Sequence, residues 1–129
     1  MALLSFTAGS TIAANDVVYV DVNGLIHKAS ATTLPQATPA GVAIDGGSAG
    51  SLLRVNPDGL FANFSGLTPG EYQYLSLTSG QIETYPTWIT SLASSSLPGA
   101  FLARVGTAAS ASGLDVEFSR PIFVSSSGL

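Results

Sequence analysis

Hydrophobic and polar residues alternate along several short stretches of the chain, which is the period of a strand with one buried face. The strongest strand prediction is DVVYVDV (16–22), which is rich in the β-branched and aromatic residues that strands favour and places Val18, Val20 and Val22 on one face. The pair Asn23-Gly24 follows it and supplies the positive φ angles of a tight hairpin turn. The sequence therefore predicts a hairpin whose second arm is LIHKA (25–29).

Two more hairpins are predicted by the same pattern. They are SLLRV (51–55) with LFANF (60–64), and EYQYLSL (71–77) with QIETY (81–85). The first would turn at Asn-Pro-Asp-Gly and the second at Ser-Gly, both frequent turn sequences. Between them, LTPGE (67–71) has the Pro-Gly order of a type II turn.

The remaining segments are shorter or less regular. GVAID (41–45) is predicted as a strand, AFLARVG (100–106) is expected to pair with LDVEFS (114–119), and RPIFV (120–124) is expected at a sheet edge because of its proline. PTWITSLASSSLPG (86–99) fits either a short helix that begins near Pro86 or a loop anchored by Trp88.

Nine or ten short strands with turn signals every 8–12 residues are typical of an all-β fold. We expect a small antiparallel β-sandwich or β-barrel with at most one short helix. Its 129 residues are expected to form a single domain (1–129), with an N-terminal arm (1–8) and a frayed tail (125–129).

Charge changes this picture more than any other property. Asp, Glu, Lys and Arg make up 9% of the chain, against about 25% in ordinary domains. A surface so poor in charge favours coverage by copies of the chain or by a partner, although a secreted β-domain with a hydroxyl-rich surface is an alternative. The net charge is −4 and the four cationic residues are scattered, so we expect no nucleic-acid partner.

Candidate chemistry is sparse. The chain has no cysteine, no signal-like start and no apolar run of membrane-spanning length. A catalytic triad would have to use His27, the only histidine, and paired carboxylates would have to be Asp115 and Glu117, which share one face of a predicted strand. A surface histidine and two solvated carboxylates are the favoured interpretations. We therefore expect no catalytic, cofactor-binding or metal-binding residue.

Apolar and aromatic residues give the candidate interface. Leu3, Leu4 and Phe6 precede the first regular strand, and they are expected to contact a neighbouring subunit or a partner. The alternative is that they form a strand of the domain's own barrel. Trp88 is the fourth interface candidate. With Tyr72, Tyr74 and Tyr85 it could also stack on sugars.

Longer segments resemble a known family. AGSTIAANDVVYVDVNGLIHKAS resembles the opening of many small phage virion proteins, whose pattern is G-D-x-V-y-x-d-x-x-G-x-v-x-x-A. PAGVAID, VNPDGLFANFSGLTPGEYQYLSLTSGQIETYP and ARVGTAASASGLDVEF continue the pattern. The chain thus resembles the capsid decoration, or cement, proteins of tailed bacteriophages and related head-fibre β-domains, over residues 8 to 118. Asn15 stands where the pattern has glycine, which is expected to alter a turn.

This resemblance implies a virion structural protein, made in the host cytoplasm, that forms a homotrimer on the capsid exterior. It would bind the major capsid protein and stabilise the shell, with no enzymatic activity and no contact with membrane. One alternative is a head-fibre or tail-fibre domain that binds a host surface glycan. A weaker alternative is a small carbohydrate-active enzyme that uses Asp115 or Glu117.

Overall fold

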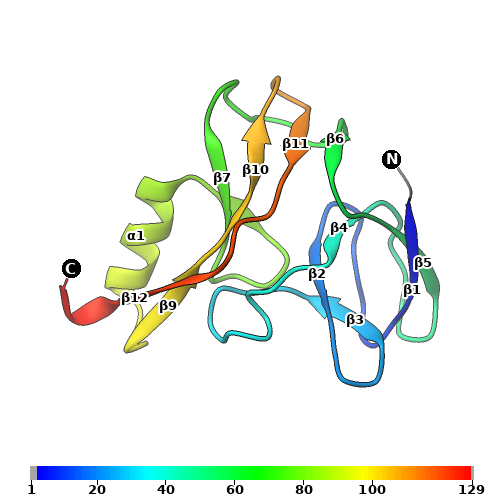
Figure 1. Cartoon of the computed structure of the whole chain (residues 1–129), viewed down its shortest axis with the longest axis horizontal. Coiled ribbons are helices and arrows are strands. Elements are labelled where there is room, and N and C mark those ends of the chain that lie inside the picture. The colour runs from blue at the N-terminus through cyan, green and yellow to red at the C-terminus, as the bar shows by residue number, and fades with distance from the viewer. Residues whose placement is uncertain (1–2, 129) are drawn as a thin grey trace.

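The first half of the chain closes into a small barrel. In the computed structural model, which describes residues 3–128, the barrel strands are β1 (Leu4–Ala8), β2 (Val17–Val20), β3 (Leu25–Lys28), β4 (Gly41–Ala43) and β5 (Leu52–Asn56). Their order is β1-β3-β2-β4-β5, and β5 pairs back with β1. The β1–β3 pair is parallel and the other pairs are antiparallel. The barrel occupies the lower right of Figure 1.

The second half forms an antiparallel sheet beside the barrel. It contains β6 (Gly59–Phe61), β7 (Tyr72–Leu75), β8 (Ile82–Glu83), β10 (Arg104–Ala108) and β11 (Leu114–Val116). The strand order is β6-β11-β10-β7-β8, so this second sheet is assembled entirely from residues that follow the barrel strands.

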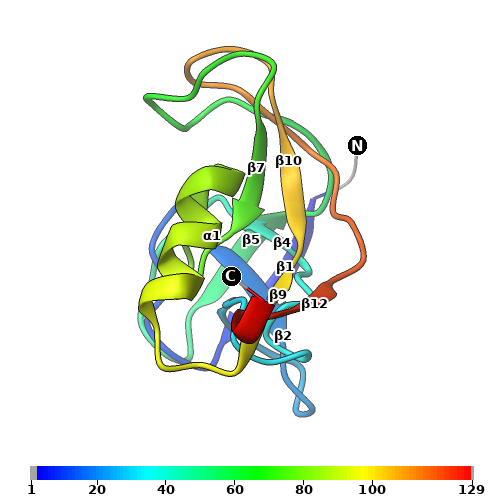
Figure 2. The same ribbon diagram turned by 90° about the vertical axis from the view of Figure 1, so that its left-hand side faces the viewer.

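A helix and a two-stranded ribbon complete the fold. Helix α1 (Tyr85–Ser94) lies beside β7, and the ribbon pairs β9 (Gly99–Leu102) with β12 (Ile122–Ser125) (Figures 1 and 2). A short 3-10 helix, η1 (Ser126–Gly128), follows β12. The predicted all-β class with one short helix is confirmed.

Three apolar clusters hold these parts together. The first fills the barrel and includes Ile12, Ile26 and Leu53. A second joins barrel residues such as Val17 to residues of the second sheet such as Val105. In the third, side chains of α1 pack against the ribbon and neighbouring loops. The middle cluster makes the barrel and the second sheet one packed unit.

Helix α1 begins where the sequence places a proline. Pro86 lies in its first turn, where the missing N–H removes no helical hydrogen bond. Trp88 and Leu92 are four residues apart, so they share one face, and both are fully buried in the cluster under the helix. Of the two interpretations of this segment, the helix is correct.

The predicted hairpin between 51–55 and 60–64 is wrong. β5 pairs with β1 and β4 in the barrel, whereas β6 pairs with β11 in the second sheet. The Asn56–Gly59 segment, with Gly59 at φ 80°, instead carries the chain from one sheet to the other. Local turn signals fix a change of direction, but they do not choose the strand that becomes the neighbour.

Other turns agree more closely with the sequence. Gly70 has φ 90° and the Glu71 N–H donates to the Thr68 carbonyl, as in the predicted type II turn. The β2–β3 hairpin forms, but only Gly24 has a positive φ, whereas two positive values were predicted. Asn15 has φ 75°, a left-handed conformation that asparagine tolerates.

Both chain ends form regular structure within residues 3–128. Residues 4–8 of the expected arm form β1, which lies between β3 and β5 and closes the barrel, as the alternative of a barrel strand predicts. In the tail, η1 follows β12, and the Ser126 N–H and hydroxyl donate to the carbonyls of Pro98 and Leu97. Residues 1, 2 and 129 lie outside the described part of the chain.

Candidate functional site

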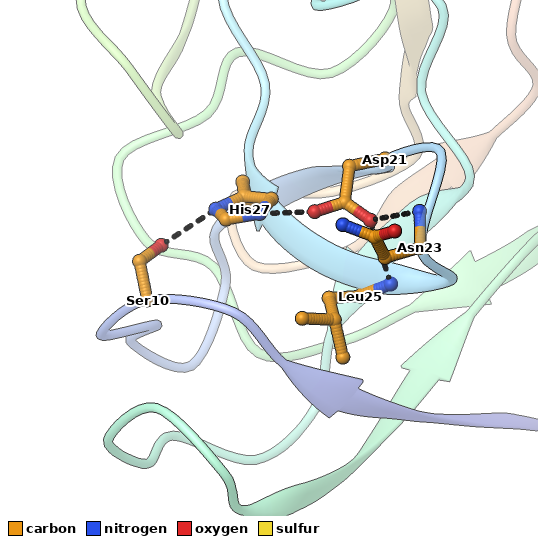
Figure 3. Close-up of polar contacts among 5 residues, drawn as sticks. All are labelled: Ser10, Asp21, Asn23, Leu25 and His27. Carbon is orange, nitrogen blue, oxygen red and sulfur yellow. Dashed lines mark hydrogen bonds and ion pairs between the residues drawn. The ribbon is translucent and has the colours of Figure 1, made fainter.

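His27 lies in a line of hydrogen bonds between β1 and the β2–β3 hairpin. Ser10 Oγ is 3.1 Å from His27 Nδ1, and Asp21 Oδ2 is 2.8 Å from His27 Nε2 (Figure 3). A neutral imidazole satisfies both contacts when Nε2–H donates to Asp21 and Nδ1 accepts from the Ser10 hydroxyl. The sequence analysis considered a triad through His27 but did not identify Ser10 or Asp21 as its neighbours.

The Asp21 carboxylate is also part of the hairpin turn. Its Oδ1 accepts hydrogen bonds from the backbone N–H groups of Asn23 and Leu25, at 2.9 and 3.0 Å. The Leu25 N–H and then the His27 side chain lower the pKa of the Asp21 carboxyl below its ordinary value. Asp21 thus orders the turn through one oxygen and orients the His27 ring through the other.

This geometry suits a structural clamp better than a nucleophilic triad. In a serine hydrolase the hydroxyl bonds Nε2 and the carboxylate bonds Nδ1, the reverse of the arrangement here. A Cβ on Gly9 would lie 2.6 Å from the imidazole, so the ring packs directly on the backbone that precedes Ser10. We therefore assign this group to holding the hairpin against the segment after β1, and name Ser10, Asp21 and His27 the His27 clamp.

Asp115 and Glu117 lie on the solvent-facing side of the second sheet, as predicted from their spacing. The two strand neighbours of Asp115 are Leu60 and Thr107, and Glu117 forms an ion pair with Arg104 at 3.1 Å. The Arg104 guanidinium also lies 5.1 Å from the centre of the Tyr72 ring. Neither carboxylate lines the cavity between the barrel and the second sheet.

The four candidate interface residues fall into different environments. Leu3 and Leu4 are 46% and 40% exposed at one end of the barrel. Phe6 packs against the apolar core of the barrel. Trp88 is completely buried beneath α1, where it stacks against Tyr85. The two leucines are therefore open to a partner, Phe6 is partly open, and an interface role for Trp88 is not retained.

The sequence analysis missed the most exposed apolar strand. Ile122 and Phe123 of β12 are 63% and 56% exposed, and Phe123 packs edge-on against Phe101 of β9. Among the strands of residues 3–128, β12 has one neighbour, β9, so its other edge presents backbone groups that no strand of this part of the chain pairs. The signal was present in RPIFV, which was predicted as an edge strand but was not examined as a contact surface.

Residues 3–128 contain neither a metal-binding cluster nor a membrane-spanning helix. Within residues 3–128, no three histidine, cysteine, aspartate or glutamate side chains gather in a way that could hold a metal ion. Neither helix of that same region is long and apolar enough to cross a membrane. No protein-family model and no curated protein matches the chain.

Proposed function

We propose that this protein is a virion structural protein, a decoration or cement protein that binds the outside of a bacteriophage capsid. Its partners would be the major capsid protein and two further copies of itself. The proposal combines the family resemblance of residues 8–118 with the surface of the folded chain. The strand β12 is the observation that carries it.

An exposed apolar edge strand is usually covered, because its free backbone groups and side chains would otherwise pair with other chains. β12 combines such an edge with the exposed side chains of Ile122 and Phe123. Within residues 3–125 of the protein, eleven large hydrophobic side chains are exposed in total. A chain with 9% charged residues has few ionic groups to desolvate when such a surface is covered.

Shell stabilisation follows from this kind of binding. A protein that binds the assembled shell and not its dispersed subunits stabilises the shell by mass action. At a hundredfold excess over Kd the gain is ~2.7 kcal/mol per site. Many sites on one particle make the total large, even where each contact is modest.

The test is to add the purified protein to expanded shells that lack it. Saturable co-sedimentation and a higher rupture temperature are expected. Light scattering of the free protein should give a mass near three times 13.0 kDa. Ile122→Lys should reduce shell binding or trimerisation, whereas Leu34→Lys, at an exposed leucine in the loop between β3 and β4, should leave both unchanged. Bare shells that are as robust as decorated ones would refute the proposal.

Glycan binding by a fibre domain is the second candidate function. It is favoured by Tyr72 and Tyr85, which are exposed aromatic rings that could stack on a sugar. If the shell experiment fails, a glycan array with the protein and with Tyr72→Ala tests this alternative. The carbohydrate-active enzyme remains the weaker candidate, because Glu117 is already paired with Arg104.

A further inference from the structure

A cavity of about 650 Å³ lies where the barrel meets the second sheet. Its wall is formed by the turn at 13–16, the loop at 64–68, the start of β7, the β7–β8 turn with β8, and the first residues of α1. This volume is within the range of ligand sites, about 300–1,000 Å³. We call it the acidic cavity because its lining contains three carboxylate side chains.

The charges of the lining are all of one sign. The lining contains Asp16, Glu71 and Glu83, and it contains no lysine, arginine or histidine. Lys28 approaches Asp16 at 3.7 Å from outside the lining, whereas Glu71 and Glu83 have no ion pair within residues 3–128. Elsewhere, Asp21, Asp45 and Glu117 each pair with a basic side chain, while Asp58 and Asp115 lie outside the cavity and have no ion pair within residues 3–128. A cavity with this composition carries a net negative charge.

Two polar side chains of the lining bear on what the acidic cavity can bind. The Oε1 atom of Glu83 is buried without a hydrogen-bond partner in residues 3–128. Buried polar groups are normally satisfied, so this oxygen marks a place where a donor is missing. Gln73 is only 5% exposed, lies on the inward-facing side of β7 and lines the same cavity, to which it adds an amide group.

The electrostatics of Glu83 agree with a missing cation. Burial raises the pKa of Glu83 above its ordinary value, against a hydrogen bond with Ser76 that lowers it. An opposite charge nearby would stabilise the ionised carboxylate and reverse this shift. Phe64, Leu67 and Ile82 add an apolar wall to the same cavity, suited to an alkyl chain or to the face of a planar cation.

We propose that the acidic cavity binds the guanidinium or ammonium group of a basic side chain from a protein partner. The carboxylates of Glu71 and Glu83 and the amide oxygen of Gln73 accept its hydrogen bonds, while the apolar wall packs against its alkyl stem. In taking that partner to be a capsid subunit, the inference rests on the function proposed above. A neutral sugar would leave the charge of the carboxylates uncompensated.

The first experiment uses the isolated protein and N-acetylarginine amide, followed by NMR. Saturable shifts of the amide signals of Gly80, Gln81 and Thr84 are expected. N-acetylcitrulline amide, a neutral analogue, should cause none. Glu71→Gln and Glu83→Gln should each weaken binding about fivefold or more, whereas Asp115→Asn, a carboxylate outside the cavity, should not change it. Equal binding of the two probes would overturn the proposal.

Further binding measurements with other ligands identify the source of the cation. If spermidine binds the acidic cavity and arginine and lysine amides do not, the ligand is a free polyamine and the protein-partner assignment is wrong. A neutral oligosaccharide that shifts the same signals more strongly than the arginine probe would overturn the cationic assignment as well. Binding of the probe should weaken as the pH falls and Glu83 becomes protonated.

A shell-binding experiment separates this inference from the function on which it rests. The double variant Glu71→Gln/Glu83→Gln should bind shells more weakly than the unaltered protein. If the variant binds equally well, the partner does not use the acidic cavity, although the decoration function stands. If the unaltered protein binds the arginine probe but no shell, the decoration function fails and the assignment to a capsid partner fails with it.

Discussion

Asn56 stands at the end of β5 with both polar atoms of its side chain buried and without a hydrogen-bond partner in residues 3–128. By contrast, the Asn15 side chain donates one hydrogen bond to the Asn63 carbonyl and accepts one from the Asn63 side-chain amide, which connects the loop before β2 to the loop after β6. The same residue type therefore costs stability in one position and connects two parts of the fold in the other. Burial and available partners determine which of these applies.

Replacing Asn56 should stabilise the protein. An unsatisfied buried amide costs about 1–3 kcal/mol, and leucine has a similar size without polar atoms. We expect Asn56→Leu to raise the free energy of unfolding by about 1 kcal/mol in urea titrations, and Asn56→Asp to lower it by about 3 kcal/mol or more. Clear destabilisation by leucine would indicate that an ordered water satisfies the amide.

The Asp45–Arg54 pair should make stability depend on acid. Two side-chain hydrogen bonds from Arg54, at 2.9 and 2.8 Å, and one from its backbone N–H lower the pKa of Asp45 to about 2. Because the folded pKa is below the ordinary value of 3.8, the pair stabilises the protein above about pH 4. This contribution should disappear as the pH falls towards 2.

Urea midpoints measured between pH 5 and pH 2 test this expectation. Asp45→Asn and Arg54→Gln should each flatten the profile in the same acidic range, because each removes one member of the pair. High salt should weaken the effect, since both side chains are partly exposed. An unchanged profile in either variant would show that other carboxylates dominate the acid response.

At the scale of elements, the sequence predicted strands better than it predicted their neighbours. The period of two locates β5 and β7 because each has one buried face, whereas β2 buries both Val17 and Val18 and is located by its β-branched and aromatic residues. It does not say that Leu53 fills the barrel while Phe61, eight residues later, belongs to the core beside the second sheet. Among candidate sites, the common strand face of Asp115 and Glu117 could be predicted from their spacing. The acidic cavity could not, because its lining brings together segments between residues 13 and 87 that only the folded chain places side by side.

The His27 clamp predicts a coupled pair of substitutions. A Cβ at position 9 would overlap the imidazole, so Gly9→Ala should displace the ring and lower stability by about 1–3 kcal/mol. In a His27→Ala background the same Gly9→Ala change should cost much less, because the clash is gone. A double-mutant cycle from urea titrations measures this coupling. Additive effects would mean that the ring moves aside without cost.

Strand β1 gives a second prediction at this scale. Deleting residues 1–8 removes the strand that pairs with both β3 and β5, together with Phe6 and Ala8 of the barrel core. We expect a loss of about 3 kcal/mol or more, seen as a lower midpoint in thermal unfolding by circular dichroism. Leu3→Ser, which changes an exposed residue before β1, should leave that midpoint nearly unchanged. A truncated chain of unaltered stability would contradict the barrel.

At the scale of the whole molecule, the acidic cavity and β12 present different chemistry to a partner. The ribbon offers apolar side chains and a free backbone edge, and the acidic cavity offers carboxylates and amides. In Figure 1 the ribbon lies at the left of the molecule, whereas the turn before β2 and strand β7, which line the cavity, lie nearer its centre. The two surfaces are therefore separate, which the proposed bridging of capsid subunits would require.

The order of the sheets along the chain has one more consequence. The five barrel strands all lie at or before Asn56, and every strand of the second sheet begins after it. A break between Pro57 and Asp58 therefore interrupts neither the barrel nor the second sheet. Each fragment would nevertheless expose its share of the middle cluster, Val17 and Val42 on one side and Leu75 and Val105 on the other. Two such fragments, expressed separately, should bind each other and reassemble. The chain would then be a pair of complementing fragments. Fluorescent-protein halves fused to the fragments would report that reunion.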